Sequence, residues 1–221
     1  MIKDMNAIGY IGNVNPAAEP KFQTAEIGIT GKTSFESTGH QVMTGDATVW
    51  EDANFDPTML TGGGNLPQRI NFASTVTGVA GFVGNQTDEV SATIEVPHCA
   101  RLNNVGQTSV KYSFHAHIYS TTTAGGNARF GLDYLFTKEG VAVTTATTLL
   151  ITVPLLTTAW AKHTFAFADI TAPDQLGSQM HWRFYRLGND ALDTSTDIVA
   201  CATVGLHYEI DSNGSRLITT K

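Results

Sequence analysis

Apolar residues recur at every second position along most of this chain, from Val49 to Ile210, in runs bounded by clusters of Gly, Asn, Asp and Pro. A β-strand points alternate side chains to opposite faces, so this period predicts strands that each bury one face. Segments with helical periodicity do not exceed a turn or two. The predicted strands cover residues 70–76, 90–96, 110–118, 130–136, 147–153, 163–167, 180–184 and 198–210. Antiparallel strands in this number predict an all-β fold, a jelly-roll β-sandwich.

Composition agrees with one folded domain. The chain has 221 residues, of which 42% are hydrophobic and 15% charged, a balance too apolar for disorder. Its formal charge of −7, without basic clusters, argues against nucleic acid as a partner. The uncharged window 140–161 holds seven threonines and Pro154, so we do not expect a membrane helix there, nor a signal peptide in residues 1–15. Cys99 and Cys201 are interpreted as small buried side chains in preference to a disulfide.

Residues 1–45 differ from the rest. Glycines and scattered apolar side chains predict an extended N-terminal arm, followed by the sandwich domain at 46–221. Ordering an arm costs roughly 1–2 kcal/mol per residue, so an ordered arm needs a surface to lie on; a loose terminus is the alternative. If the arm docks, its apolar side chains form the interface. These candidates are Phe22, Ile27, Ile29 and Phe35.

Several short motifs have a simpler interpretation than the site that they resemble. The GITGKTS run at 28–34 is two residues too short for a phosphate-binding loop, because only Ile29 and Thr30 separate its first glycine from the Gly-Lys pair. Asp190, Asp193 and Asp197 lack the spacing of an EF-hand and indicate a solvated turn. The three tryptophans, Trp50, Trp160 and Trp182, are expected to be buried aromatics and not a sugar-stacking platform. No nucleophile elbow is present, so no catalytic residue and no cofactor are predicted.

His115 and His117 are the best catalytic lead, because alternate residues of one strand face the same way and two imidazoles can share a metal. A cupin-type metal site also needs a glutamate and a glycine at positions that Thr121, Thr122 and Ser109 occupy here. A third ligand would have to be His98, His181 or His207, which the sequence alone does not place. We therefore expect hydrogen-bonded or interface histidines and keep the pair as candidate metal ligands.

Several segments together resemble a family of jelly-roll virion structural proteins of tailed bacteriophages. The resemblance covers about residues 48–221 and leaves out the arm. It is carried by VWED at 49–52, VPH at 96–98, HAHI at 115–118, GLDY at 131–134, RLGND at 186–190, LHYEID at 206–211 and GSR at 214–216. Where relatives tend to show His-Pro-His with a further histidine and a tryptophan, this chain has Ala116, Tyr119 and Ser120.

The resemblance implies a non-enzymatic virion component, assembled in the bacterial cytoplasm and located on the capsid surface. Its expected role is capsid decoration, or cement: the protein oligomerises, as a trimer, and binds the major capsid protein through the arm. One alternative is a tail-fibre module whose loops at 121–127 and 188–196 meet host glycan. Another is a cupin-like metalloenzyme that uses His115 and His117.

Overall fold

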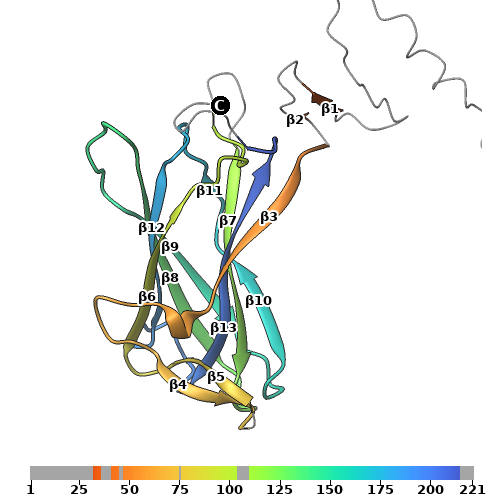
Figure 1. Ribbon diagram of the computed structural model, residues 1–221. Helices are drawn as coiled ribbons and strands as arrows, with labels where there is room; N and C mark the ends of the chain where they lie inside the picture. Colours follow the sequence, from red (N-terminus) through yellow and green to blue (C-terminus); the bar gives the residue numbers. More distant parts are fainter. Residues whose placement is uncertain (1–31, 36–40, 45–46, 75, 104–109, 215–221) are drawn as a thin grey trace, which may run out of the picture.

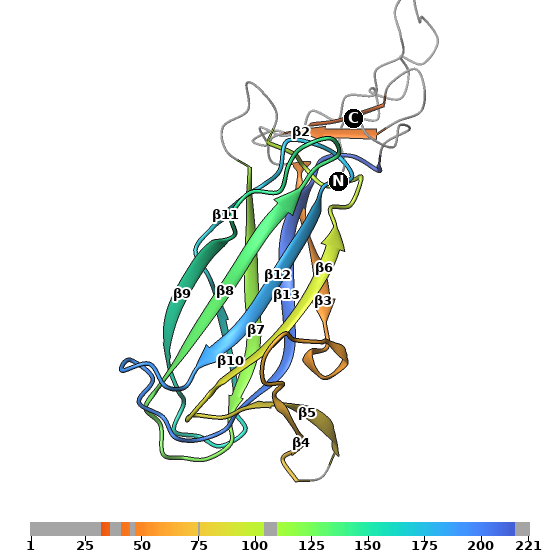
Figure 2. The same ribbon diagram turned by 90° about the vertical axis from the view of Figure 1, so that its left-hand side faces the viewer.

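The computed structural model describes residues 32–35, 41–44, 47–74, 76–103 and 110–214. Nearly all of the regular secondary structure in this part of the chain is β-strand, and most of the strands form two sheets that face each other (Figures 1 and 2). The one-turn 3-10 helix η3 (Pro57–Met59) starts at Asp56, whose carboxylate accepts the Thr58 amide. Among these residues, no helix has the length and hydrophobicity needed to cross a membrane.

The first sheet runs in the order β10-β7-β13-β5-β4, with β3 also paired to β13 and β11 to β7. The second runs β6-β12-β8-β9, and every pairing is antiparallel. The strands of the first sheet are β3 (Val49–Phe55), β4 (Gln68–Phe72), β5 (Val76–Phe82), β7 (Lys111–Ser120), β10 (Lys162–Ala166), β11 (Ile170–Thr171) and β13 (Val199–Ile210). Those of the second are β6 (Thr87–Glu95), β8 (Asn127–Thr137), β9 (Thr147–Pro154) and β12 (Gln179–Leu187).

The strand pairs are nested in sequence. The first strand of the sandwich, β3, pairs with the second half of the last strand, β13. The first residues of β13 pair with β5. Inside that pair, β6 joins β12, β7 joins β10, and β8 joins β9. A long antiparallel ribbon rolled upon itself gives this order, which defines a jelly roll. The predicted fold class, an antiparallel jelly-roll β-sandwich, is confirmed.

Aromatic rings join the two sheets in the core. Phe114 of β7 contacts Trp182 of β12 with ring centroids 5.1 Å apart. Phe184 of β12 stacks on Phe130 of β8 at 5.3 Å, and Phe130 in turn stacks on Phe165 of β10 at 5.1 Å. Each such side chain contributes roughly 1.5–3 kcal/mol on burial, so this cluster is a main source of stability.

Two predicted strands differ in detail from the observed ones. The predicted strand at 70–76 is interrupted by a turn, in which Ala73 and Ser74 have positive φ of 47° and 64°. In β13 the register shifts between Cys201 and Thr203, so that Val199 and Cys201 face the core in the first half and Val204 in the second. The single parity predicted for 198–210 is therefore wrong over its first half, because a β-bulge inserts one residue.

Two short strands precede the sandwich. β1 (Lys32–Phe35) and β2 (Gln41–Thr44) form an antiparallel hairpin within the segment predicted as an arm. The hairpin meets the end of β13, where the Met43 amide donates to the Asp211 carbonyl and Val42 bridges Ser212. Of the candidate interface residues, Phe35 is 45% exposed. The others, Phe22, Ile27 and Ile29, lie outside the described residues.

Candidate functional site

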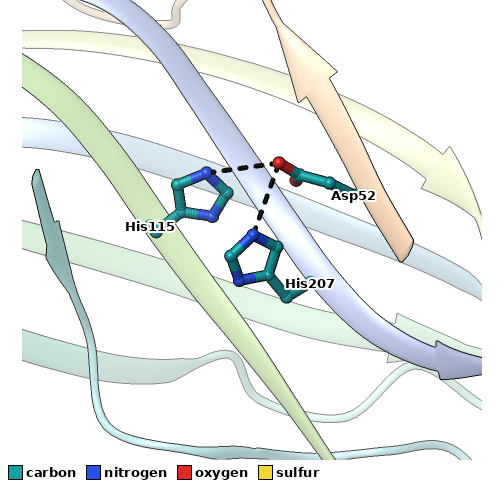
Figure 3. A group of neighbouring side chains, drawn as sticks. All are labelled: Asp52, His115 and His207. Atoms are coloured by element: carbon teal, nitrogen blue, oxygen red, sulfur yellow. Dashed lines mark ion pairs between the residues drawn. The ribbon is translucent and has the colours of Figure 1, made fainter. Parts of the chain in front are cut away.

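The outer face of the first sheet carries a cluster of three ionisable side chains. On β7, Phe114 and Ala116 point into the core, so His115 and His117 project from the opposite face. His115 meets Asp52 from β3 and His207 from β13, as Figure 3 shows. The cluster thus joins three strands that are far apart in sequence.

The side chains of this cluster converge on one point. Oδ2 of Asp52 lies 3.6 Å from Nε2 of His115 and 3.4 Å from Nε2 of His207. The two imidazole rings stack, with centroids 4.1 Å apart and 23° between their planes. One ligand atom from each residue lies within 4.8 Å of the other two. Two imidazoles and one carboxylate form a donor set that suits zinc and related transition metals.

The environment of His115 is unusual for an outer sheet face. Its side chain is buried, and neither ring nitrogen has a hydrogen-bond partner among the described residues. A buried polar group without a partner costs about 1–3 kcal/mol. The imidazole fits because Gly205 lies opposite it on β13: a Cβ there would stand 2.5 Å from Cε1 of His115.

Burial also affects protonation. It lowers the pKa of His115, and the nearby Asp52 carboxylate opposes this effect only in part. Burial and the charge of Lys162 likewise lower the pKa of His117. Both rings are therefore neutral at neutral pH, and neutral imidazole is the form that binds metals.

Part of this cluster follows from the sequence alone. His115 and His117 do face the same way, with ring centroids 5.0 Å apart, but Nδ1 of His117 is hydrogen-bonded to the Thr164 hydroxyl. Of the three possible third ligands only His207 joins them. His98 lies near Glu95 instead, and His181 bonds to Thr93 and Thr137 on the second sheet.

Asp52 was not among the candidates, because the strand 49–55 was not predicted. A signal for it exists in the sequence: Trp50, Asp52 and Asn54 alternate with Ala53 and Phe55, which pack against the core. This alternation places Asp52 on an outer face, where it can meet a histidine of the neighbouring strand.

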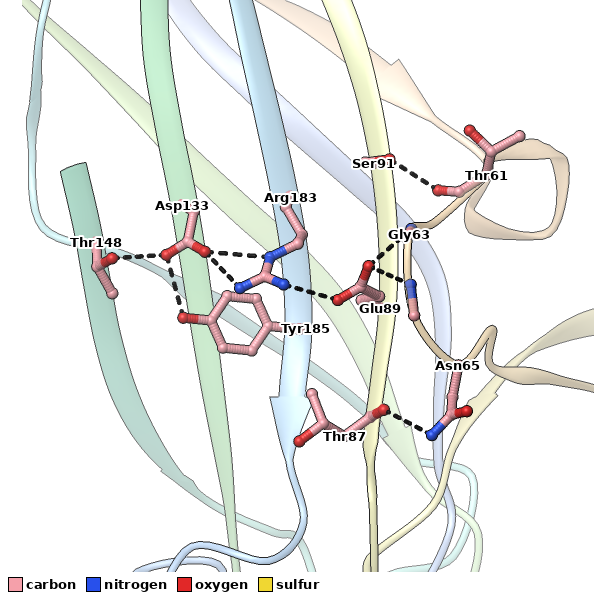
Figure 4. A network of polar contacts seen from close by, with 11 residues as sticks. Thr61, Gly63, Asn65, Thr87, Glu89, Ser91, Asp133, Thr148, Arg183 and Tyr185 are labelled. Atoms are coloured by element: carbon pink, nitrogen blue, oxygen red, sulfur yellow. Dashed lines mark hydrogen bonds and ion pairs between the residues drawn. The ribbon is translucent and has the colours of Figure 1, made fainter. Parts of the chain in front are cut away.

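A polar network crosses the outer face of the second sheet (Figure 4). Asp133 of β8 accepts hydrogen bonds from Thr148 of β9 and from Tyr185 and Arg183 of β12. Arg183 also donates to Glu89 of β6 at 2.9 Å. The other oxygen of Glu89 accepts the amides of Gly63 and Gly64, at 2.8 and 2.7 Å. The network therefore holds the loop at 61–65 against the edge of β6, a structural role.

An open cavity of about 510 Å³ lies beside this network, lined among others by Tyr134, His181, Trp182 and Arg183. Its tryptophan offers no stacking platform, since Trp182 is only 3% exposed. The other tryptophans lie elsewhere: Trp160 packs against Phe72, and Trp50 is 55% exposed on β3. The expectation of burial is thus right for Trp182 and wrong for Trp50.

The loops at 121–127 and 188–196 meet at the end of the sandwich opposite the β1–β2 hairpin (Figure 1). The Asn127 amide donates to the Thr194 hydroxyl at 2.9 Å, and the Thr194 amide donates to the Asn127 carbonyl at 3.0 Å. The second loop is fixed by Arg186 of β12, whose buried guanidinium makes a bidentate pair with Asp193. Arg186 also donates to the carbonyls of Phe82, Ser195 and Asp197.

This arrangement explains the acidic residues of the second loop. Each aspartate has its own partner: Asp193 pairs with Arg186, Asp197 accepts from the Thr122 hydroxyl, and Asp190 accepts the Leu192 amide. They form no common metal site in the described part of the chain. The Cys201 thiol is free and fully buried in the core.

Comparisons with known proteins give no family. No family model matches the chain, and no curated protein matches it. Similar solved structures include the CBM36-1 domain of a multidomain xylanase from the hindgut metagenome of Trinervitermes trinervoides, at 14% identity and TM-score 0.37, covering 76% of this chain and 100% of that one. An insecticidal delta-endotoxin of Bacillus thuringiensis matches at 11% identity and TM-score 0.41, covering 90% and 31%.

A third similar structure is that of infectious bursal disease virus, Gx strain, at 9% identity and TM-score 0.28, covering 90% of this chain and 49% of that one. The chain thus spans a third to a half of the toxin and virus chains that it matches. Because every one of these TM-scores is below 0.5, the fold is assigned from the strand order described above.

Proposed function

We propose that this protein is a non-enzymatic structural component of a bacteriophage virion, a capsid decoration protein that forms oligomers and binds the major capsid protein through its N-terminal segment. The observation that carries the proposal is the β1–β2 hairpin at the end of the jelly roll. A two-stranded hairpin is marginally stable on its own. This one contacts residues 211 and 212 after β13, and contact with a second molecule would stabilise it further.

Exposed apolar side chains support a protein partner at this end. Phe35 on β1 is 45% exposed, and Val49 and Trp50, at the start of β3, are 48% and 55% exposed. Large aromatic side chains are enriched where proteins bind each other. The sequence resemblance to phage virion proteins implies that the partner is the major capsid protein and that the oligomer is a trimer.

Deletion of residues 1–45 tests the proposal. Full-length and truncated protein are each mixed with heads assembled from the major capsid protein of the same virus, and co-sedimentation is measured. We expect the truncated protein to remain a folded oligomer by circular dichroism and native mass spectrometry, but no longer to coat heads. Unchanged head binding would reject the role of the N-terminal segment, and a monomer that turns over a substrate would reject the function itself.

A second function is favoured by one observation, the meeting of the two loops at the opposite end. The loops at 121–127 and 188–196, hydrogen-bonded to each other, present a shared surface on which Leu192 is 53% exposed. A tail-fibre module would use such a surface to bind host glycan. Binding of the purified protein to a glycan array or to host cells, lost in Leu192→Ala and retained after deletion of residues 1–45, would support this function over decoration.

A further inference from the structure

We propose that Asp52, His115 and His207 form a binding site for a divalent transition-metal ion of the zinc class, which ties β3 to β7 and β13. The proposal goes beyond the function above and does not depend on it, because an ion can strengthen the sandwich whatever the sandwich binds.

The two carboxylate-to-imidazole distances fit a metal ion better than direct hydrogen bonds. Zn²⁺ binds imidazole nitrogen and carboxylate oxygen at about 2.0–2.2 Å, so two ligands of a tetrahedral ion lie about 3.3–3.6 Å apart. The two carboxylate-to-imidazole distances here are 3.6 and 3.4 Å. At the longer distance His115 and Asp52 share no hydrogen bond, and an ion placed between them satisfies both groups.

The burial of His115 is the second, independent observation. Its side chain is 3% exposed, its nitrogens lack hydrogen-bond partners in the described part of the chain, and Nε2 faces the Asp52 carboxylate. Only a glycine at position 205 leaves room for it. A polar ring held in this way, with one nitrogen directed at a carboxylate and a second imidazole, is what a metal site requires.

An ion can reach this site from solvent. The side chains of His207 and Asp52 are 43% and 32% exposed, so the cluster is open to solvent on the side of these two residues and closed on the side of the buried His115. Three protein ligands leave a fourth position for water on the open side. Because the ligands come from three strands, we assign the ion a structural role: it fixes β3, which carries Trp50 and follows the hairpin in the chain.

The test uses untagged full-length protein stripped with EDTA, since a histidine tag would bind the probe ion. Zn²⁺ is titrated by calorimetry, and Co²⁺ is used as a spectroscopic probe of tetrahedral coordination. The variants are His207→Ala and Asp52→Asn, which alter the two exposed ligands, and the matched control is His98→Ala, a histidine outside the cluster. Circular dichroism checks that all of them fold.

We expect one Zn²⁺ per chain, the visible absorption of tetrahedral Co²⁺, and a rise in Tm on adding Zn²⁺. His207→Ala and Asp52→Asn should each weaken Zn²⁺ binding at least tenfold and abolish the rise in Tm, whereas His98→Ala should behave as wild type. Absence of saturable binding in the wild-type protein would overturn the proposal. So would equal affinity in the wild type and in both ligand variants, because the ion would then be bound elsewhere.

Discussion

His115 and Gly205 are directly opposite each other on β7 and β13, and the imidazole fills the space that a Cβ at position 205 would take. The second sheet repeats this relationship: Tyr185 on β12 lies opposite Gly131 on β8, and its ring would contact a Cβ there. In each sheet a side-chain ring lies over a glycine of the neighbouring strand on the outer face. Because glycine has no side chain, the ring can pack against the sheet there instead of standing in solvent. Gly205 therefore leaves room for the His115 ring, and Gly131 leaves room for the Tyr185 ring of the polar network.

Replacement of Gly205 by alanine should destabilise the protein. The added methyl group would stand 2.5 Å from Cε1 of His115 and 2.8 Å from Oδ1 of Asp52, so at least one of these side chains must move. Overpacking of this kind costs roughly 1–3 kcal/mol. Urea denaturation followed by circular dichroism measures the loss.

Gly63→Ala is the matched control, because its Cβ would meet only Oε1 of Glu89, at an ordinary contact distance of 3.4 Å. Its amide hydrogen bond to Glu89 is kept in this variant. We expect the control to lie within about 0.5 kcal/mol of wild type, as surface changes usually do. Equal stability of the two alanine variants would show that His115 does not depend on the space above Gly205.

Replacement of Arg186 by methionine should destabilise the protein more strongly. The change removes the partner of Asp193, and both side chains are 0% exposed. Breaking one member of a buried ion pair typically costs about 3–5 kcal/mol, because the other charge stays behind unpaired. The unfolding midpoint in urea should fall accordingly.

The double variant Arg186→Met/Asp193→Leu separates charge from packing. It removes both charges, so it should recover at least about 1 kcal/mol relative to Arg186→Met alone. Full recovery is not expected, because the carbonyls of Phe82, Ser195 and Asp197 still lose their donor. A double variant no more stable than the single one would show that the unpaired charge of Asp193 is not the main cost of removing Arg186.

The sequence was sufficient to predict the sandwich because burial of one face imposes a period of two wherever a strand is regular. It failed where the backbone departs from that regularity. The bulge between Cys201 and Thr203 moves the core-facing side chains from odd-numbered to even-numbered positions. No residue type there predicts a bulge. The turn at Ala73 and Ser74 uses positive φ without a glycine, so the expected turn signal is absent.

The site was predicted in part for a related reason. Same-strand neighbours such as His115 and His117 follow from periodicity alone. Cross-strand neighbours depend on register, and the register that brings His207 beside Asp52 is fixed by pairing strands at opposite ends of the chain. Single-sequence patterns carry no information on such pairing, which is why Asp52 was missed.

Cys201 should make stability depend on alkaline pH. Burial raises the pKa of its thiol from 9.0 to about 12, so the folded protein keeps the thiol neutral while the unfolded chain ionises near pH 9. The stability is therefore fully present below pH 9 and is lost as pH rises towards 12. At pH 10.5 the expected loss is about 2 kcal/mol, because each pH unit above the unfolded pKa costs about 1.4 kcal/mol.

Urea midpoints measured at pH 8 and pH 10.5 in reducing buffer check this pH dependence, with Cys201→Ala as the comparison. Buried tyrosines such as Tyr112, whose pKa burial also raises, contribute to both proteins and cancel in the difference. The alanine variant should be less stable at pH 8 but lose less stability on going to pH 10.5. Identical losses in both proteins would mean that the Cys201 thiol is not shielded from solvent in the folded state.

Trp50 and Leu192 allow the two ends of the sandwich to be compared in one experiment. Both are large apolar side chains more than half exposed, at 55% and 53%, so truncation to alanine should change the free energy of unfolding by less than about 0.5 kcal/mol in either case. At a protein interface, loss of a central tryptophan typically costs 2 kcal/mol or more, about a 30-fold loss of affinity. If the end that carries the hairpin binds the capsid, Trp50→Ala should weaken head binding by at least tenfold while Leu192→Ala leaves it unchanged. The reverse result would place the binding surface on the loops at the other end, because the two variants differ in location and hardly at all in exposure or in their effect on folding.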